Sequence, residues 1–336
     1  MKAMTVACAA ALAAAFSVPA ALAQTKITGV YSIATLGPGT TLNATSAGMA
    51  KLFNANSSAR MRLREAGGFL EVLVGRGETQ FAIGTTPGGY DAYAGVGVYP
   101  NRPVKNLRTA TLGPVLYGSL LVQTASGARY VEDLKGKKIP SSFPGSPLFL
   151  VDINVLFSGG GLTWKDVTAV PMSGIRENYQ AFLDGVTDAA NASVGTGFIN
   201  QANAKHRGVR FIGMRPVPDL AARLQKVKPG YYPALLKAGY ATGIAEDTTV
   251  WAKDIAIMTS SRVPDEVVYT LVKIVWEHVR ELDSVHPAMK TWTQEGMARA
   301  NNTSPMHAGA VRFFKQVSKW TPDREALQKQ LLAVHK

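Results

Sequence analysis

The chain has 336 residues, with 36 Lys and Arg against 23 Asp and Glu, and a formal net charge of +13 at pH 7. A basic chain can bind nucleic acid, but the longest basic clusters, Lys135–Lys138 and Lys205–Arg207, are short and contain no aromatic residues for stacking. The length exceeds one typical domain core and predicts two lobes.

The N-terminus has the layout of a cleavable secretory signal. Lys2 gives a positive start, the Ala-rich apolar run Ala3–Phe16 follows, and Ala21–Ala23 offers small residues to a signal peptidase. A transmembrane anchor is the alternative, but this run is shorter than the roughly 20 strongly apolar residues that a span needs. We therefore expect residues 1–23 to be a signal peptide, cleaved after Ala23, and the mature protein to be periplasmic.

Cleavage at this site would remove Cys8, the only cysteine of the chain. A mature chain without cysteine has no disulfide, no thiolate metal site and no cysteine nucleophile.

The first part of the mature chain alternates between strands, loops and helices. A β-branched strand over Lys26–Ile33 ends at the Gly-rich loop Gly37–Thr41, and apolar residues at helical spacing predict a helix over Leu42–Asn54. The further elements expected here are a helix over 69–76 and strands over 80–84, 108–112 and 116–123.

The same alternation restarts near residue 131, which favours a second α/β lobe with parallel strands. A helical turn and a strand are expected over Val131–Pro140, and Gly159–Gly161 ends the next helix. The remaining expectations are helices over 148–157, 175–183 and 264–282, strands over 167–171, 189–193 and 250–259, and an irregular segment over 216–249.

No catalytic motif of the common hydrolases, zinc proteases or P-loop enzymes is present in the sequence. The five histidines show no paired spacing for a metal, and His278 falls within an amphipathic helical segment, where a structural or solvated role is the common one. We therefore predict that the protein is not an enzyme and has no cofactor and no metal ion. Paired carboxylates would leave no such signature, so a periplasmic enzyme remains an alternative.

Two Gly/Ser/Thr loops stand where strands lead into helices, Gly37–Thr41 in one lobe and Ser141–Ser146 in the other. Such loops expose backbone N–H groups at helix N-termini, where the helix dipole favours a carboxylate or another anion. The alternative is that these loops only turn the chain.

Further motifs follow in a fixed order along the chain: Ser32–Thr41, Gly48–Asn54, Ala66–Gly68, Gly77-Glu78, Phe81–Gly84, Asp133–Lys138, Pro144–Ser146, Gly161–Val167, Asp184–Ala189, Tyr231–Pro233 and His307–Phe314. In this order the mature chain resembles the TAXI family, the extracytoplasmic solute receptors associated with TRAP transporters. The resemblance covers nearly the whole mature chain.

The resemblance implies an α/β, two-lobed fold of the periplasmic-binding-protein type II, with a ligand cleft between the lobes. Chain crossings near Leu120 and Trp251 would place residues 24–119 and 256–336 in lobe I and residues 120–255 in lobe II. It also implies that the receptor delivers its ligand, an amino acid or a small carboxylate, to integral membrane TRAP permease subunits.

The chain departs from the family pattern in three loops. Leu42-Asn43 stand where the family has aromatic residues, Thr85-Thr86-Pro87 where it favours Gln-Ser-Asp, and Pro147-Leu148-Phe149 where it favours Gly-Thr-Glu. Two loops thus lack a carboxylate, and one gains a phenyl ring. A site built this way should disfavour an ammonium group and prefer an anion with an apolar or aromatic body.

The resulting prediction is a receptor for a small organic carboxylate that acts without catalysis or nucleic acid. Loop hydroxyls and Asn43 donate hydrogen bonds, two aromatic rings contact the apolar body, and Arg176 clamps the carboxylate unless it is a solvated helix-start residue. The predicted ligand-binding residues are Thr40, Thr41, Asn43, Thr85, Thr86, Ser146, Phe149, Arg176 and Tyr232. A receptor for another importer type and a periplasmic ligand sensor are the other readings.

Overall fold

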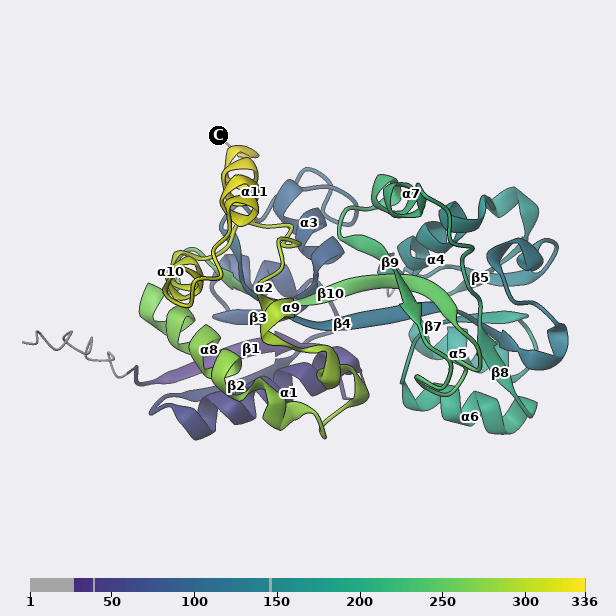
Figure 1. Ribbon diagram of the computed structural model, residues 1–336, viewed down its shortest axis with the longest axis horizontal. Helices are drawn as coiled ribbons and strands as arrows, with labels where there is room; N and C mark the ends of the chain where they lie inside the picture. The colour runs from purple at the N-terminus through teal and green to yellow at the C-terminus, as the bar shows by residue number, and fades with distance from the viewer. Residues whose placement is uncertain (1–26, 39, 145–146, 336) are drawn as a thin grey trace, which may run out of the picture.

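The computed structural model describes residues 27–38, 40–144 and 147–335 (Figure 1). The predicted signal peptide, residues 1–23, lies outside the described residues. Among the helices of the described part, none is both long enough and apolar enough to cross a membrane.

Two long strands run through both halves of the molecule. Strand β4 (Leu107–Gln123) and strand β10 (Thr248–Ser260) pair in antiparallel orientation and extend from one half to the other (Figure 1). Within the described residues, the main sheet has the order β2-β1-β3-β10-β4-β7, with β8 beside β4 and β9 beside β10.

The half with the N-terminal strands contains β1 (Val30–Thr35), which pairs in parallel with β2 (Arg60–Glu65) and β3 (Phe81–Thr85). Strand β3 is buried throughout because it lies between β1 and β10. Helices α1 (Thr41–Asn56), α2 (Leu70–Arg76) and α3 (Thr86–Ala94) follow these strands. The C-terminal helices of this half are α8 (Asp265–His278), α9 (Gln294–Met297), α10 (Ala308–Gln316) and α11 (Pro322–Ala333).

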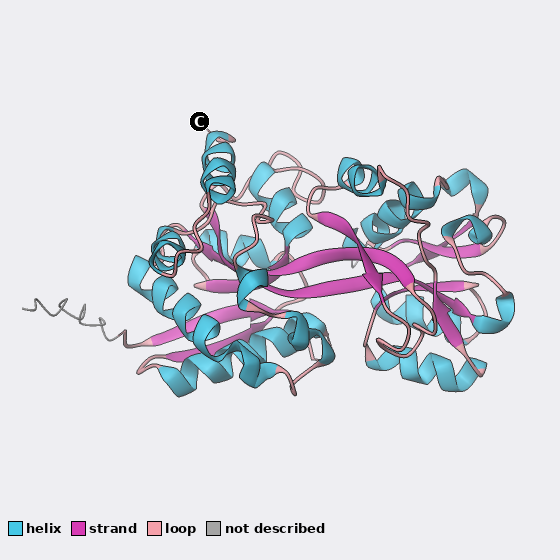
Figure 2. Cartoon of the chain, in the orientation of Figure 1, coloured by secondary structure: helices cyan, strands magenta, loops and turns pink. Residues whose placement is uncertain are grey.

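The other half adds β7 (Ala189–Ser193) and β8 (Val209–Phe211) to β4, and β9 (Tyr231–Leu236) to β10. A separate two-stranded parallel sheet consists of β5 (Lys138–Ser142) and β6 (Thr168–Met172). Helices lie around the strands in both halves (Figure 2). Those of this half are α4 (Pro147–Gly160), α5 (Ile175–Leu183), α6 (Gly197–His206) and α7 (Leu220–Val227).

The pairing of β4 with β10 is interrupted near its middle. The register shifts between Asp254 and Ala256, opposite the β4 segment that contains Pro114, which has no N–H to donate. The backbone groups on either side of this bulge bond to the 3-10 turn Pro287–Thr291 and the residue after it. Val115 N–H donates to Thr291 Oγ1 at 2.8 Å, and Trp292 Nε1 donates to the Leu112 carbonyl at 3.1 Å.

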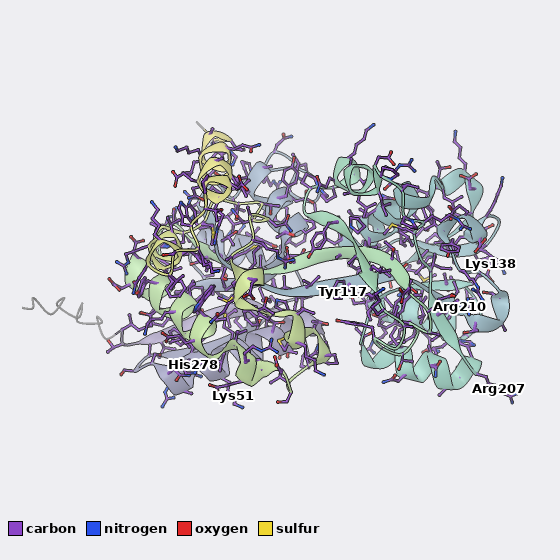
Figure 3. All side chains as sticks on the ribbon, viewed as in Figure 1. Lys51, Tyr117, Lys138, Arg207, Arg210 and His278 are labelled. Carbon is purple, nitrogen blue, oxygen red and sulfur yellow. The ribbon has the colours of Figure 1, made fainter. Side chains whose placement is uncertain are left out.

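The basic clusters lie at the surface. Lys135, Lys138, Lys205 and Arg207 are exposed, and Figure 3 shows Lys138 and Arg207 on the half that contains β5 and α6. His278 bonds to Glu281, with Nδ1 and Oε1 2.8 Å apart, near the surface of the other half.

Several element predictions need correction. The strands expected over 108–112 and 116–123 are one strand, β4, because β10 and the 3-10 turn provide partners on both sides of Pro114. The segment 216–249 is not irregular throughout, since it contains α7 and β9. Strand β2 and helix α3 were not predicted, and antiparallel β4 and β10 make the main sheet mixed, not parallel.

Candidate functional site

A cavity of about 410 Å³ lies between the two halves of the molecule. Its walls are mainly apolar and come from both sides. Leu36, Leu42 and Ile83 belong to the half with the N-terminal strands, and Leu148, Phe149 and Ile175 belong to α4 and α5 of the other half. A cavity of this size and composition suits a small organic molecule.

Five helices of the described part begin at this cavity. Residues in the first turns of α1, α2, α3, α4 and α5 line it, among them Leu42, Leu70, Gly88, Leu148 and Ile175. The first N–H groups of a helix lack partners within the helix and carry partial positive charge, so the starts of the four longer helices, α1, α3, α4 and α5, favour an anion.

A buried polar cluster forms part of the cavity wall. Lys253 Nζ donates to Asp152 Oδ1 at 2.6 Å and to the Tyr231 hydroxyl at 3.1 Å, and Tyr231 donates to the same carboxylate. Asp152 and Lys253 line the cavity although each is only 3% exposed. Burial, followed by the charge of Asp152, raises the pKa of Tyr231, so its hydroxyl remains a donor. The two charges therefore compensate each other inside the protein.

Glu71, on α2, is a second carboxyl group at the cavity. It is 7% exposed, and the Tyr99 hydroxyl donates to its Oε2 at 2.6 Å. Among the described residues, no Lys or Arg nitrogen lies within 4.0 Å of this carboxyl. Burial raises the pKa of Glu71 and nearby Asp91 adds to the rise, while the Tyr99 hydrogen bond and the backbone N–H of Glu71 lower it.

Of the predicted ligand-binding residues, Thr85 and Phe149 line the cavity, and Phe149 packs on Phe143 with ring centroids 5.7 Å apart. Ser146 lies outside the described residues. The structure does not test the roles of these residues, so their binding of a ligand stays a prediction.

The predicted residues at the start of α1 hold the loop that precedes the helix. Thr40 caps α1 by accepting from the Asn43 N–H at 3.1 Å, and the Asn43 side chain donates to the Leu36 carbonyl at 2.9 Å. Thr41 is buried in the first turn. These residues do not line the cavity but shape the loop that contributes Leu36 and Leu42.

The remaining three predicted residues lie away from the cavity wall. The Thr86 hydroxyl donates to the Gly230 carbonyl at 3.3 Å, and the Tyr232 hydroxyl donates to Asp254 Oδ1 at 3.0 Å. Arg176 is exposed, next to the lining residue Ile175. Their contacts with a ligand stay predictions as well.

The sequence analysis missed Glu71, Asp152 and Lys253, and it expected few carboxylates at the site. Glu71 and Asp152 come from helices rather than from the loops that were compared, so the cavity does contain carboxyl groups. Lys253 offered a usable signal. A charged residue within the apolar segment 250–259 requires a buried partner, although sequence does not say which one.

Comparison with known proteins gives one family and several solved structures. The model of a family described as NMT1-like matches residues 33–317, most of the chain. MatC (Rpa3494) from Rhodopseudomonas palustris with bound malate has 14% identity and a TM-score of 0.51, covering 92% of this chain and 99% of that chain.

Two further structures have the same fold. R. palustris Rpa4515 with adipate has 13% identity and a TM-score of 0.51, covering 91% of this chain and 96% of that chain. The periplasmic binding protein BugD has 11% identity and a TM-score of 0.52, covering 92% and 98%. These similarities confirm the predicted fold class, a mixed α/β, two-lobed periplasmic-binding-protein fold.

Proposed function

We propose that this chain, which belongs to the NMT1-like family, is a periplasmic solute receptor and not an enzyme. The observation that carries the proposal is the cavity, to which both halves contribute walls and five helices of the described part present their first turns. A ligand in such a cavity contacts both halves, and the charged residues Asp152 and Lys253 of the cavity wall engage each other.

The ligand is a small organic carboxylate with an apolar body. The helix starts favour the carboxylate, and the apolar walls, including Phe149, favour the hydrocarbon part. Malate and adipate in the structures named above are small carboxylates, which supports this ligand class. Arg176 and the loop residues Thr40, Thr41, Asn43, Thr85, Thr86 and Ser146, with Tyr232, are proposed to contact the ligand once the halves close.

The receptor delivers its ligand to TRAP-type permease subunits, as the resemblance to the TAXI family implies, after a signal peptide is cleaved behind Ala23. A receptor for another type of importer remains the second candidate, because two-lobed receptors of different importers look alike. The two lobes comprise residues 24–119 with 256–336, and residues 120–255. The boundaries at 120 and 255 fall within β4 and β10, the strands that run through both halves.

The ligand class can be tested with matched pairs of compounds that differ by one ammonium group. We expect 3-phenylpropanoate, 4-methylpentanoate and glutarate to raise the melting temperature more than phenylalanine, leucine and glutamate, because only a ligand that binds the native state stabilises it. Isothermal calorimetry then gives the affinities. Tighter binding of every amino acid than of its deaminated partner would contradict the proposal.

Variants of the cavity wall sharpen this test. Phe149→Glu places a charged carboxylate against the apolar body of the ligand and should abolish binding, whereas Phe149→Leu retains an apolar wall and should bind within about tenfold of the parent. Arg176→Ala tests the proposed clamp against Lys135→Ala, which removes the same charge from an exposed position of the same half. Equal affinities for these last two variants would remove Arg176 from the site.

A further inference from the structure

Glu71 differs from the other charged residues of the cavity because no Lys or Arg of the described residues pairs with it. Asp152 and Lys253 pair with each other, at 2.6 Å. Glu71 is as well buried as a core residue, yet within the described part its one side-chain hydrogen bond comes from Tyr99 and involves only Oε2. Oε1 is left without a side-chain donor at the wall of the cavity.

Two glycines make room for this second oxygen. A Cβ atom on Gly84 would lie 2.9 Å from Glu71 Oε1, and one on Gly88 would lie 3.2 Å from it. Both glycines line the cavity, at the end of β3 and in the first turn of α3. The carboxyl group therefore fits against bare backbone next to the position that a ligand would occupy.

The charges around Glu71 do not stabilise a negative carboxylate. Asp91, on α3, is negative and pairs with Lys228, so that this lysine is already engaged. Arg76, on α2 itself, is exposed and lies 3.8 Å from Glu78. A buried carboxylate without a cation is costly, and such a group lowers its free energy by taking up a proton.

We propose that Glu71 is the specificity-determining residue of the cavity, and that its carboxyl group holds a proton which it donates as a hydrogen bond to the carboxylate of the ligand. The inference rests on the proposed function. It narrows the ligand class to carboxylates without an ammonium group. A protonated Glu71 joins the helix starts as a donor to the anion, and it offers no negative charge to an ammonium group.

This arrangement makes ligand affinity depend on pH with a definite sign. Simple carboxylic acids are ionised above about pH 5.5, so the ligand itself does not titrate at higher pH. Affinity is full while Glu71 is protonated. It falls as the pH rises through the Glu71 pKa, approaching a tenfold loss per pH unit for one bound proton.

Infrared spectroscopy of the ligand-free protein tests the proton directly. The difference spectrum between the parent and Glu71→Gln should contain the C=O stretch of a protonated carboxylic acid near neutral pH. Gln has the same shape and can still accept from Tyr99, so the fold should persist. Glu78→Gln, a matched change at a half-exposed glutamate that follows α2, should leave the band in place. Absence of the band from the parent protein would overturn the inference.

Calorimetry with 3-phenylpropanoate, 4-methylpentanoate and adipate, between about pH 5.5 and pH 8.5, tests the role in binding. We expect the parent and Glu78→Gln to lose affinity by up to about tenfold per pH unit, and Glu71→Gln to bind with a Kd that does not change with pH. A parent protein that loses the infrared band within this pH range but binds with a constant Kd would overturn the inference and leave the proposed function intact. Failure of all three acids to bind at any pH would contradict the proposed function. The infrared experiment would still show whether the Glu71 carboxyl group is protonated.

Discussion

Asp152, Tyr231 and Lys253 tie helix α4 to strands β9 and β10 beside the cavity. Both charged groups are buried, and Lys253 Nζ also lies 4.7 Å from the Trp251 ring centroid and 5.0 Å from that of Tyr231. Desolvation of two charges is costly, and their attraction and hydrogen bonds offset that cost only while both partners are present. Breaking this buried pair should therefore lower stability more than breaking one of the exposed ion pairs of the surface.

Removal of one partner should be strongly destabilising. Lys253→Met leaves Asp152 buried without its cation, and we expect the free energy of unfolding to fall by about 3–5 kcal/mol in denaturant titrations. Lys237→Met, which breaks the exposed pair with Asp247, should lower the free energy of unfolding far less. The double variant Asp152→Leu/Lys253→Met should be more stable than Lys253→Met alone. If Lys253→Met and Lys237→Met lowered the free energy of unfolding by similar amounts, the buried pair would not have the special effect on stability that is predicted here.

The long pair of strands β4 and β10 depends on residues far along the chain. Beside the bulge, Val115 lies opposite Asp254 of β10, but its N–H donates to Thr291, whose hydroxyl also donates to the Ala288 carbonyl at 2.7 Å. A buried N–H without an acceptor is unfavourable, so the 3-10 turn is part of what allows Pro114 within a continuous strand.

Thr291→Val should remove the hydrogen bond between this turn and Val115, while the valine side chain keeps the shape of threonine. We expect unfolding to become easier by about 1–3 kcal/mol, because Val115 N–H then remains buried without an acceptor. Thr291→Ser retains the hydroxyl and should lose less. Hydrogen exchange at Val115 should accelerate only in the valine variant. If the serine variant were the less stable of the two, the lost methyl group and not the hydroxyl would explain the effect.

We expect the two halves of the molecule to close on a ligand. β4 and β10 are the long strands that extend through both halves, and the cavity lies between walls that belong to each (Figure 1). A ligand that contacts both walls favours the form in which they are close together, since it interacts more strongly with that form.

Small-angle scattering should show this closure. With a saturating concentration of the tightest-binding carboxylate, we expect a smaller radius of gyration than without ligand. The Phe149→Glu variant should show no change under the same conditions, because it does not bind. An unchanged radius for the parent protein, with binding shown by calorimetry in the same sample, would mean that the walls do not move.

Part of this structure could be predicted because it depends on neighbouring residues in the chain. The bounds of α5 and β7 agree with the predicted 175–183 and 189–193, where helical spacing, a glycine after the helix and a short apolar run are all local signals. The two-lobed α/β fold followed from chain length and from the alternation of such signals. The charged strand β2 left no such signal, because at the sheet edge only Met61 of its six residues is buried.

The cavity depends on contacts that only the folded chain makes. Asp152 and Lys253 are 101 residues apart in the sequence, and Val115 and Thr291 are 176 apart. Hydrophobic periodicity describes which face of an element is buried, but it does not say which polar side chains meet across the interior. Sequence therefore predicted the class of fold, and it leads us to expect an anion at the helix starts. Tertiary packing decided that Lys253 is engaged by Asp152 and that Glu71 is buried without a cation, because burial and pairing are properties of the assembled core.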